Sequence, residues 1–387
     1  MQSGLKLSET DYSLRIVDTL SDIDKEIWDS IDPDMPFYQS YSFLKVIENI
    51  HTDIEFRYAL MYKDEQVIAA LYTQLLDFSF RNLVNYSGQS SNAVKTAFRK
   101  YMADKKTKLL NLGNVFFTGD KGIICKNNVT VIPHIPQVFE KINLSFKKNK
   151  PSAFLIANIY LADEKKCLNF YNSAFHPFVT DPDIFMRIDA SWMNFDDYID
   201  ALASKYRVRT KKVLSVSSGI MSKDFSMEEL RAQKMNLTKL YNNVVNHVAF
   251  NMAVLNIDFF EQMKATYDER CSITGYFKAN ELVSFVCLFN VDSDTMHVHY
   301  IGLDYDKNKE YKIYNRMLLD FVKMAIENRK KQIHFGRTAT EIKTTIGAVP
   351  SPLHAYIKMN NGLINASLPY FLKRIKPPEY TARNPFK

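Results

Sequence analysis

The stretch that decides the fold runs from residue 295 to residue 348 and reads TMHVHYIGLDYDKNKEYKIYNRMLLDFVKMAIENRKKQIHFGRTATEIKTTIGA. Apolar residues later in this stretch recur every three or four positions, as on one buried face of a helix: Ile313, Met317, Phe321 and Met324. The stretch predicts a strand–helix–strand crossover. In order, the predicted elements are a strand at 296–304, a polar link, a helix at 311–328, a strand at 332–337 and a helical segment at 338–348.

The predicted crossover helix begins shortly after its strand ends, and this bears on function. Helix N-termini carry free N–H groups and the positive end of the helix dipole, so they favour phosphates and other anions. Two interpretations stay open at this point. One is an ordinary strand–helix–strand unit, and the other is a site for an acyl thioester.

The composition is that of a globular protein with a modest basic excess. The 387 residues are 46% hydrophobic and carry a formal net charge of +7, and the chain is long enough for two domains. The positive charge suits an acidic partner, such as the phosphates of coenzyme A, an acyl carrier protein, RNA or an anionic membrane face. Glycine is scarce, with 11 residues, which argues against glycine-rich nucleotide loops.

Cysteine spacing and apolar runs bear on the compartment. The four cysteines, at positions 125, 167, 271 and 287, have no metal-ligand spacing and form no CxxC pair, so we expect no metal site and a reducing compartment. The N-terminal residues lack an apolar signal segment. No apolar run approaches the roughly 20 residues of a membrane helix. We expect a cytoplasmic protein.

The two halves of the chain repeat one order of predicted elements: helices, a hairpin, a strand, a helix, a buried strand, a helix and a strand. Their hairpin turns share a pattern, KDEQ at 63–66 and KANE at 278–281. Such repetition predicts an internal duplication, with one domain over 1–189 and another over 190–387. We expect the first half to close with a hairpin whose turn is DPD at 181–183.

Several segments resemble the FemAB-like branch of the GNAT acyltransferases, in which the GNAT fold is used twice. They are LLNLGNVFFTGDKG (109–122), NFDDYIDALASKYRVRTKK (194–212), LYNNVVNHVAFNMAVLNIDFFEQM (240–263) and residues 300–358. The resemblance covers most of the chain. It implies an α/β (α+β) protein of two tandem GNAT-like domains, each with a mixed, mostly antiparallel sheet flanked by helices. It also implies a bacterial acyltransferase. We expect the C-terminal domain to hold the chemistry, because it keeps the better strand–helix crossover.

One departure from the family concerns the acyl donor. Single-domain GNAT enzymes carry an Arg/Gln-x-x-Gly-x-Gly/Ala loop before the crossover helix, whereas the matching residues here, DYDKNKEYK (304–312), contain no glycine. FemAB-type members also depart from that loop, and some take their acyl group from aminoacyl-tRNA. The resemblance implies acyl-CoA or acyl carrier protein as co-substrate, with no tightly bound cofactor, and aminoacyl-tRNA as the alternative donor.

Acyl transfer to an amine needs a base for the amine and a hydrogen-bond donor for the developing oxyanion. His297 and His299 lie two residues apart on one strand, hence on one face, and the pKa of histidine suits base chemistry near neutral pH. We predict His299 as the base and His297 as the second candidate. Asp304, just past the strand, is a third. The resemblance implies that a backbone N–H near 298–301 binds the oxyanion. Packing histidines and an ordinary turn are the alternatives.

Polar and basic residues around the crossover are candidates for binding the acyl donor: Tyr305, Tyr311, Lys312, Asn315, Arg337 and Lys343. A second set belongs to the densest basic run and could bind a polyanion such as RNA or a carrier protein: Lys205, Arg207 and Arg209. A solvated surface is the alternative for both sets. The basic and aromatic tail, 368–387, suits either a short interfacial anchor or a helix packed on the domain.

Together these expectations describe an N-acyltransferase that moves an acyl group from a thioester donor to an amine of an amino acid, an amino-lipid or a cell-wall precursor. An aminoacyl-tRNA-dependent transferase of the FemAB type is the alternative enzyme. A non-catalytic binding protein with a degenerate acyl site is the alternative of another class. We expect peripheral contact with the inner membrane through the tail, and no DNA partner.

Overall fold

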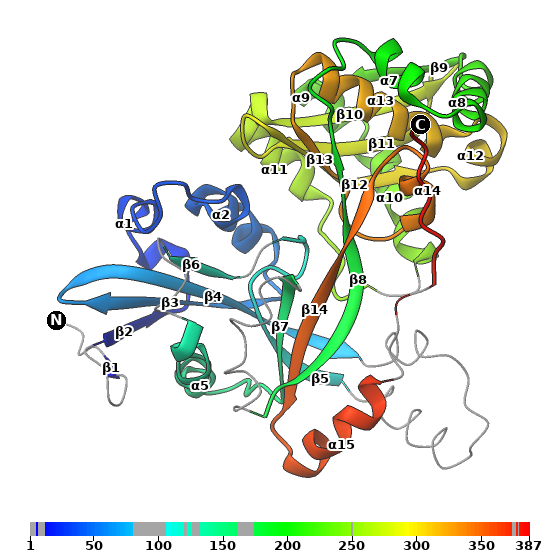
Figure 1. Ribbon diagram of the computed structural model, residues 1–387. Coiled ribbons are helices and arrows are strands. Elements are labelled where there is room, and N and C mark those ends of the chain that lie inside the picture. The colour runs from blue at the N-terminus through cyan, green and yellow to red at the C-terminus, as the bar shows by residue number, and fades with distance from the viewer. Residues whose placement is uncertain are drawn as a thin grey trace. The chain divides into compact units, whose positions relative to one another are not determined.

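The chain folds into two compact units, and neither is continuous in sequence. The computed structural model describes residues 5–6, 12–79, 106–119, 122–125, 132–160, 174–248, 251–373, 377 and 379–387. Unit 1 comprises 1–180, 249–254 and 352–377, and unit 2 comprises 181–248, 255–351 and 378–387. Each unit contains a run of mixed, mostly antiparallel strands with helices packed against them (Figure 1).

The sheet of unit 1 orders its strands β1-β2-β3-β4-β5-β7-β14, with β6 beside β4. Neighbouring strands are antiparallel except β5 and β7, which are parallel. The predicted KDEQ hairpin is confirmed as β3 and β4. The strands are β1 (Leu5–Lys6), β2 (Tyr12–Val17), β3 (Glu55–Lys63), β4 (Gln66–Ser79), β5 (Lys106–Leu112), β6 (Ile123–Cys125), β7 (Ala153–Tyr160) and β14 (Val349–Met359).

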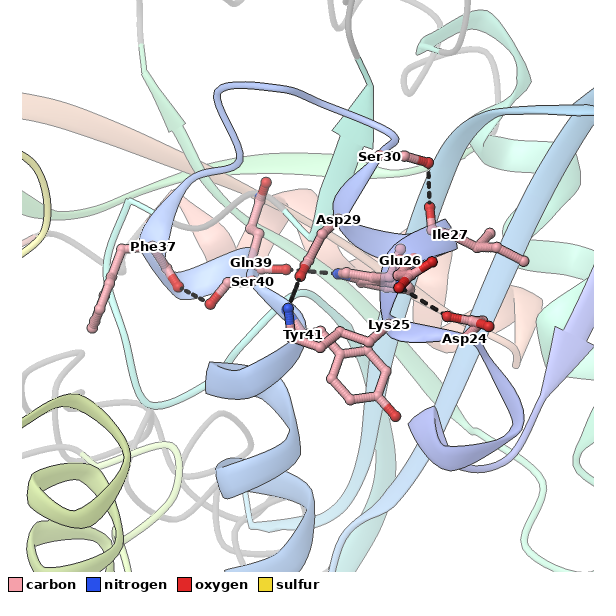
Figure 2. A network of polar contacts seen from close by, with 11 residues as sticks. Asp24, Lys25, Glu26, Ile27, Asp29, Ser30, Phe37, Gln39, Ser40 and Tyr41 are labelled. Carbon is pink, nitrogen blue, oxygen red and sulfur yellow. Dashed lines mark hydrogen bonds and ion pairs between the residues drawn. The ribbon is translucent and has the colours of Figure 1, made fainter.

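Helices cover both faces of that sheet, with α1 and α2 on one face and α5 on the other (Figure 1). Side-chain bonds hold the first two helices together (Figure 2). Asp24 accepts a hydrogen bond from the N–H of Glu26 and so caps α1, while Asp29 accepts one from the N–H of Tyr41 at 3.2 Å. The described helices are η1 (Leu20–Asp22), α1 (Lys25–Asp29), η2 (Phe37–Gln39), α2 (Tyr41–Ile50), η3 (Ile132–His134), α5 (Ile135–Ser145) and α15 (Gly362–Leu372).

The sheet of unit 2 has the strand order β8-β13-β12-β11-β10-β9. Only β12 and β13 are parallel, and the other neighbours are antiparallel. The predicted KANE hairpin is confirmed as β10 and β11. The strands are β8 (His176–Arg187), β9 (Ile220–Asp224), β10 (Cys271–Lys278), β11 (Glu281–Asn290), β12 (Thr295–Leu303) and β13 (Gln332–His334).

The crossover helix α13 carries the predicted apolar face into the core of unit 2. Ile313, Met317 and Phe321 are buried, and Met324 packs against the same core. The helices of this unit are α7 (Phe195–Ala201), α8 (Ser204–Val216), α9 (Met227–Ala232), α10 (Lys234–His247), α11 (Asp258–Tyr267), η5 (Asp268–Arg270), α12 (Tyr305–Tyr311), α13 (Ile313–Glu327) and α14 (Thr340–Thr344).

The two units arrange their strands in the same way. In each, consecutive antiparallel strands lead to a parallel pair joined by a helical crossover, which is α5 in unit 1 and α12–α13 in unit 2. An antiparallel strand then closes the sheet, and it comes from the other half of the chain. Residues 352–359 of β14 close unit 1, and residues 181–187 of β8 close unit 2. The predicted fold class, an α/β protein with mixed and mostly antiparallel strands flanked by helices, is confirmed.

Two local predictions are wrong. The polar link expected at 304–310 is largely the helix α12, because Asp304 caps it by accepting hydrogen bonds from the N–H groups of Asp306 and Lys307. The expected DPD turn at 181–183 lies inside the unbroken strand β8. There, contacts with residues about 150 positions away outweigh the local turn preference of Asp and Pro, and Asp183 is fully buried.

Candidate active site

The parallel strands β12 and β13 separate at the centre of unit 2. Their pairing covers three residue pairs and ends at His297 and His334. Beyond that point the chain after β13 continues beside β8, its other neighbour, since the N–H of Phe335 donates to the carbonyl oxygen of Ile184 at 2.8 Å. Strand β12 continues beside β11 to Leu303. The side of β12 that faced β13 is therefore released from strand pairing over the residues that follow His297.

A β-bulge lies in the same part of β12. Val298 pairs with Leu288 and Ile301 pairs with Val286, so two residues of β12, His299 and Tyr300, face one residue of β11. A bulge leaves a residue out of the ladder and re-aims backbone groups and side chains, and bulges often lie next to active sites. This one falls within 298–301, where the resemblance implied the backbone N–H that binds an oxyanion.

Three histidines gather where the strands part. His297 is buried and stacks on His334 with ring centroids 3.8 Å apart, and the His299 ring lies 4.9 Å from that of His297. The fully buried carboxylate of Asp183 lies 3.4 Å from Nε2 of His334 and 3.8 Å from Nε of Arg337. Within the described part of the chain, no three of the His, Cys, Asp or Glu side chains are grouped to hold a metal ion.

Burial depresses the basicity of the two histidines on β12. Desolvation, aided by the charge of His334, holds the pKa of His297 well below its usual range and lowers the pKa of His299 to about 3. Burial disfavours the charged form of an imidazole because the imidazolium loses its hydration. Both rings are therefore neutral near pH 7, and each is a weak proton acceptor in this setting.

Burial makes Lys343 a better candidate for the base than either histidine, because it lets the amine lose its proton near neutral pH. It is 5% exposed, and its Nζ donates hydrogen bonds to the carbonyl oxygens of Phe335 and Arg337, both at 2.8 Å. Desolvation lowers the pKa of its amine to about 7, while the charge of Asp183 acts in the other direction. A neutral lysine amine has two hydrogens and one lone pair, so two carbonyl acceptors leave the lone pair available.

The turn that carries Lys343 toward β13 contains unusual backbone. Gly336, Thr338 and Ala339 all have positive φ angles, of 64°, 63° and 50°. Glycine adopts this conformation readily, but a β-branched residue such as Thr338 does so at a cost. Residues held in sparsely populated conformations cluster at active sites. The turn therefore fixes the approach of α14 to the end of β13.

Comparison with known proteins identifies the fold. No family model matches the chain, and no curated protein matches it in sequence. Among solved structures, that of FemX has a TM-score of 0.54 and 11% identity, covering 89% of this chain and 98% of that chain. A tandem GNAT protein from the clavulanic acid biosynthesis pathway has a TM-score of 0.51 and 8% identity, with the same coverage of both chains. This is the tandem GNAT fold of FemAB-like proteins.

In this tandem GNAT fold, side chains accept hydrogen bonds from N–H groups at both helix starts that follow β12. Asp304 caps α12, and the side-chain oxygen of Asn308 accepts from the N–H of Tyr314 at 2.9 Å, at the start of α13. Asp304 and Tyr305 also line a groove of about 360 Å³. Its other lining residues are Asn243, Asn246, His247 and Asp306. With two carboxylates in its lining, the groove is a poor environment for phosphate.

The remaining donor-binding candidates lie at the junction of α12 and α13. Tyr311 ends α12, and the ammonium of Lys278 lies 4.7 Å from the centre of its ring. Lys312 is exposed in a left-handed conformation between the two helices, and Asn315 is half-buried in the first turn of α13. The structure thus separates the predicted donor-binding set into two groups. Arg337 and Lys343 lie beside the histidines, and the others lie beyond the end of β12.

The basic run forms the helix α8. Lys205 and Arg209 are exposed, whereas Arg207 is half-buried, lies 3.5 Å from Asp200 and donates to the carbonyl oxygen of Leu202. Residues 204–219 contain no Asp or Glu and include two further exposed lysines, at 211 and 212. The helix therefore presents a positive face, and polyanion binding there stays a prediction.

The predicted tail separates into two packed parts. Leu368 and Leu372 of α15 are buried in a core cluster of unit 1, and Phe386 packs against the core of unit 2. Contact with a membrane stays a prediction. Among the described residues, the helices are all too short or too polar to cross a bilayer.

Sequence reasoning missed Asp183 and His334. Asp183 stands in a stretch that has the composition of a turn, and His334 in a short apolar strand. Neither carries a local signal, because the contact between them joins residues about 150 positions apart. The sequence signal that could have indicated Asp183 is an acidic residue directly before the apolar residues 184–186.

Proposed function

We propose that the protein is an N-acyltransferase that moves an acyl or aminoacyl group onto an amine. The observation that carries the proposal is the buried amine of Lys343, with a pKa of about 7, beside the point where β12 and β13 separate. A base with this pKa is matched to proton transfer near neutral pH. The tandem GNAT fold supports the same reaction class by analogy.

The proposed reaction has three parts. The neutral amine of Lys343 takes a proton from the acceptor ammonium, and the freed amine attacks the carbonyl carbon of the acyl donor. A backbone N–H of the bulge at His299 and Tyr300 stabilises the oxyanion that forms. The bond from the carbonyl carbon to the leaving sulfur or oxygen then breaks, and the proton held by Lys343 passes to that atom. The attacking nitrogen still carries one proton more than an amide nitrogen holds, and this second proton passes to the neutral Lys343 and from there to solvent. Atoms and charge then balance without a metal or a redox partner.

The second charged group near Lys343 has a supporting role in this proposal. The carboxylate of Asp183 lies beside Arg337 and His334, and it favours the protonated form of Lys343. Without that carboxylate, desolvation alone would push the pKa of Lys343 lower still. Asp183 thus keeps Lys343 able to hold a proton during the reaction and to return it to the leaving group.

For the acyl donor, we favour a polyanionic carrier over free coenzyme A. A diphosphate needs free helix N–H groups or a glycine-rich turn. At the two helix starts after β12, Asp304 caps α12 and Asn308 accepts from the N–H of Tyr314 in α13. The positive face of α8 suits the acidic surface of an acyl carrier protein or the backbone of an aminoacyl-tRNA. The proposed acceptor is an amine of an amino acid, an amino-lipid or a cell-wall precursor.

The test offers one acyl group on three carriers: coenzyme A, acyl carrier protein and tRNA. Acyl transfer to a panel of amines is followed by mass spectrometry, and carrier binding by the shift in melting temperature. We expect turnover with acyl carrier protein or tRNA and little with coenzyme A. A melting shift without turnover on the whole panel would support the rival, a non-catalytic binding protein. Turnover with coenzyme A alone would overturn the preference for a polyanionic carrier.

A further inference from the structure

The residues from Arg383 to Lys387, here called the strap, run back across unit 2. The N–H of Ala203 donates to the carbonyl oxygen of Pro385 at 2.8 Å, and the N–H of Lys387 donates to that of Ala201 at 3.3 Å. Leu202 and Phe386 form an antiparallel bridge. The strap is thus anchored on the link between α7 and α8 by main-chain hydrogen bonds.

The ring of Phe386 fills a space beside the turn that follows α14. Its centroid lies 5.6 Å from that of Trp192 and 6.3 Å from that of Tyr198. At Gly347, which has a φ of 102°, an added Cβ would lie 2.4 Å from the Phe386 ring. Tyr198 also donates its hydroxyl hydrogen to the carbonyl oxygen of Ile346 at 3.1 Å. The turn is therefore held by two aromatic side chains.

Arg383 binds α14 itself. Its guanidinium donates to Glu341 at 2.6 Å, and its backbone N–H donates to the hydroxyl oxygen of Thr344 at 3.1 Å. Helix α14 has five residues, and its N-cap residue, Ala339, makes no side-chain capping bond. A helix this short is not stable by itself, so its position depends on the packing around it.

We infer that Arg383 and Phe386 are positioning residues, which hold α14 so that Lys343 reaches the carbonyl oxygens of Phe335 and Arg337. This inference rests on the proposed function for its catalytic meaning, although the contacts themselves do not. Loosening the strap lets α14 move outward and lets water reach the amine. The other titratable and charged groups near Lys343 lie on β8, on β12 and on or just after β13: Asp183, His297, His299, His334 and Arg337. The strap acts on Lys343 through packing rather than through its own charge.

The experiment compares Phe386→Ala and Arg383→Ala with Phe386→Leu and Arg383→Lys in the full chain. Hydrogen exchange followed by mass spectrometry reports the protection of residues 340–348. Carbon-13 NMR of protein labelled at the lysine ε-carbon, with Lys343→Met to assign the signal, reports the titration of Lys343. In the alanine variants we expect exchange at 340–348 to quicken about tenfold, and the pKa of Lys343 to rise by about one unit. The conservative variants should recover most of both effects.

Arg231→Ala is the matched control, because Arg231 makes an exposed ion pair of similar length with Glu261, at 2.7 Å, on another part of unit 2. It should change neither readout. Unchanged exchange at 340–348 in both alanine variants would overturn the inference. So would faster exchange with an unchanged Lys343 titration, because the strap would then stabilise α14 without positioning the amine. Both readouts are independent of turnover, so failure of the proposed function would appear separately, as an inactive wild-type protein.

Discussion

The imidazole rings of His297 and His334 stack with their centroids 3.8 Å apart at the last paired position of β12 and β13. This stack marks where the two strands separate, and Phe185 extends it on the other side of His334 at 4.3 Å. Three stacked aromatic rings therefore pack in a row at the end of the parallel pair. The bulge that supplies the proposed oxyanion donor begins two residues further along β12, at His299.

The first prediction concerns acid stability. The folded-state pKa values of His297 and His299 lie below their usual range, so below about pH 6.5 the unfolded chain binds protons that the folded chain does not. The free energy of unfolding should therefore fall as the pH drops from 7 toward 4. His297→Phe, which keeps a ring in the stack, should make this fall shallower. Urea unfolding at a series of pH values measures it, and equal pH dependence in the variant and the wild type would contradict the prediction.

The second prediction concerns the proton acceptor. Lys343→Arg keeps a cation but cannot release a proton near neutral pH, so we expect turnover to fall on the order of 10²–10⁴-fold, the usual contribution of a general base. In the wild type, kcat/KM should rise with pH through about 7 as the Lys343 amine loses its proton. Lys323→Arg, an exposed lysine of α13, is the control. An active Lys343→Arg enzyme would show that only the charge matters.

The same assay tests whether the imidazole of His299 is the general base. If its imidazole were the base, His299→Gln would lose as much turnover as Lys343→Arg. With a pKa of about 3, the ring does not titrate between pH 5 and 9. We therefore expect His299→Gln to keep the wild-type pH profile. A profile that loses its acidic limb in this variant would return the role of base to His299.

The third prediction concerns Asp304, which the sequence suggested as catalytic and which caps α12. Asp304→Ala should lower the free energy of unfolding by roughly 0.5–2 kcal/mol, and Asp304→Asn by much less, because an amide oxygen also caps a helix. Asp306→Ala, whose side chain is 94% exposed, is the control for stability. Turnover decides the catalytic question. Retained turnover in Asp304→Asn means that the carboxylate acts as a cap, and lost turnover with intact stability means that it acts in the reaction.

The fourth prediction concerns the carrier. Changing Lys205 and Arg209 of α8 to Glu should weaken binding of the active carrier and flatten its dependence on salt, because fewer ions are released on binding. The same change at Lys147 and Lys148, which are exposed in unit 1, should leave the affinity within about twofold. Fluorescence anisotropy at a series of salt concentrations measures both. An unchanged salt slope in the α8 variant would leave α8 as a plain solvated helix.

The fold could be predicted where periodicity is long and local. The apolar face of α13 and the two hairpins carry strong patterns over many residues, and the structure confirms them. The prediction of a polar link at 304–310 was wrong, because the polar composition of these residues suits both a link and a capped, exposed helix. The strand β8 failed because Pro182 and two aspartates have the chemistry of a turn, and only the distant partners of Asp183 make them a strand.

The candidate site could be predicted only in outline. His297 was predicted because it shares one face of a strand with His299, and Arg337 and Lys343 because they follow a strand end. The structure brings the three into one charged and buried neighbourhood. Burial is what assigns chemistry within that group, and it depends on packing that no local pattern records. The sequence therefore favoured a histidine as the base. Burial instead favours Lys343, because it lowers the pKa of His299 to about 3 and that of Lys343 to about 7.

The exchange of closing strands has a consequence for how the protein is made. Unit 1 finishes its sheet with residues 352–359 of β14, which are synthesised about 170 residues after residue 180. The edge of β7 that pairs with β14 must therefore stay unpaired until those residues have been made. An unpaired strand edge invites association with other chains. The speed of synthesis and early binding by chaperones should therefore affect how much of the chain reaches the folded state rather than associating through this edge.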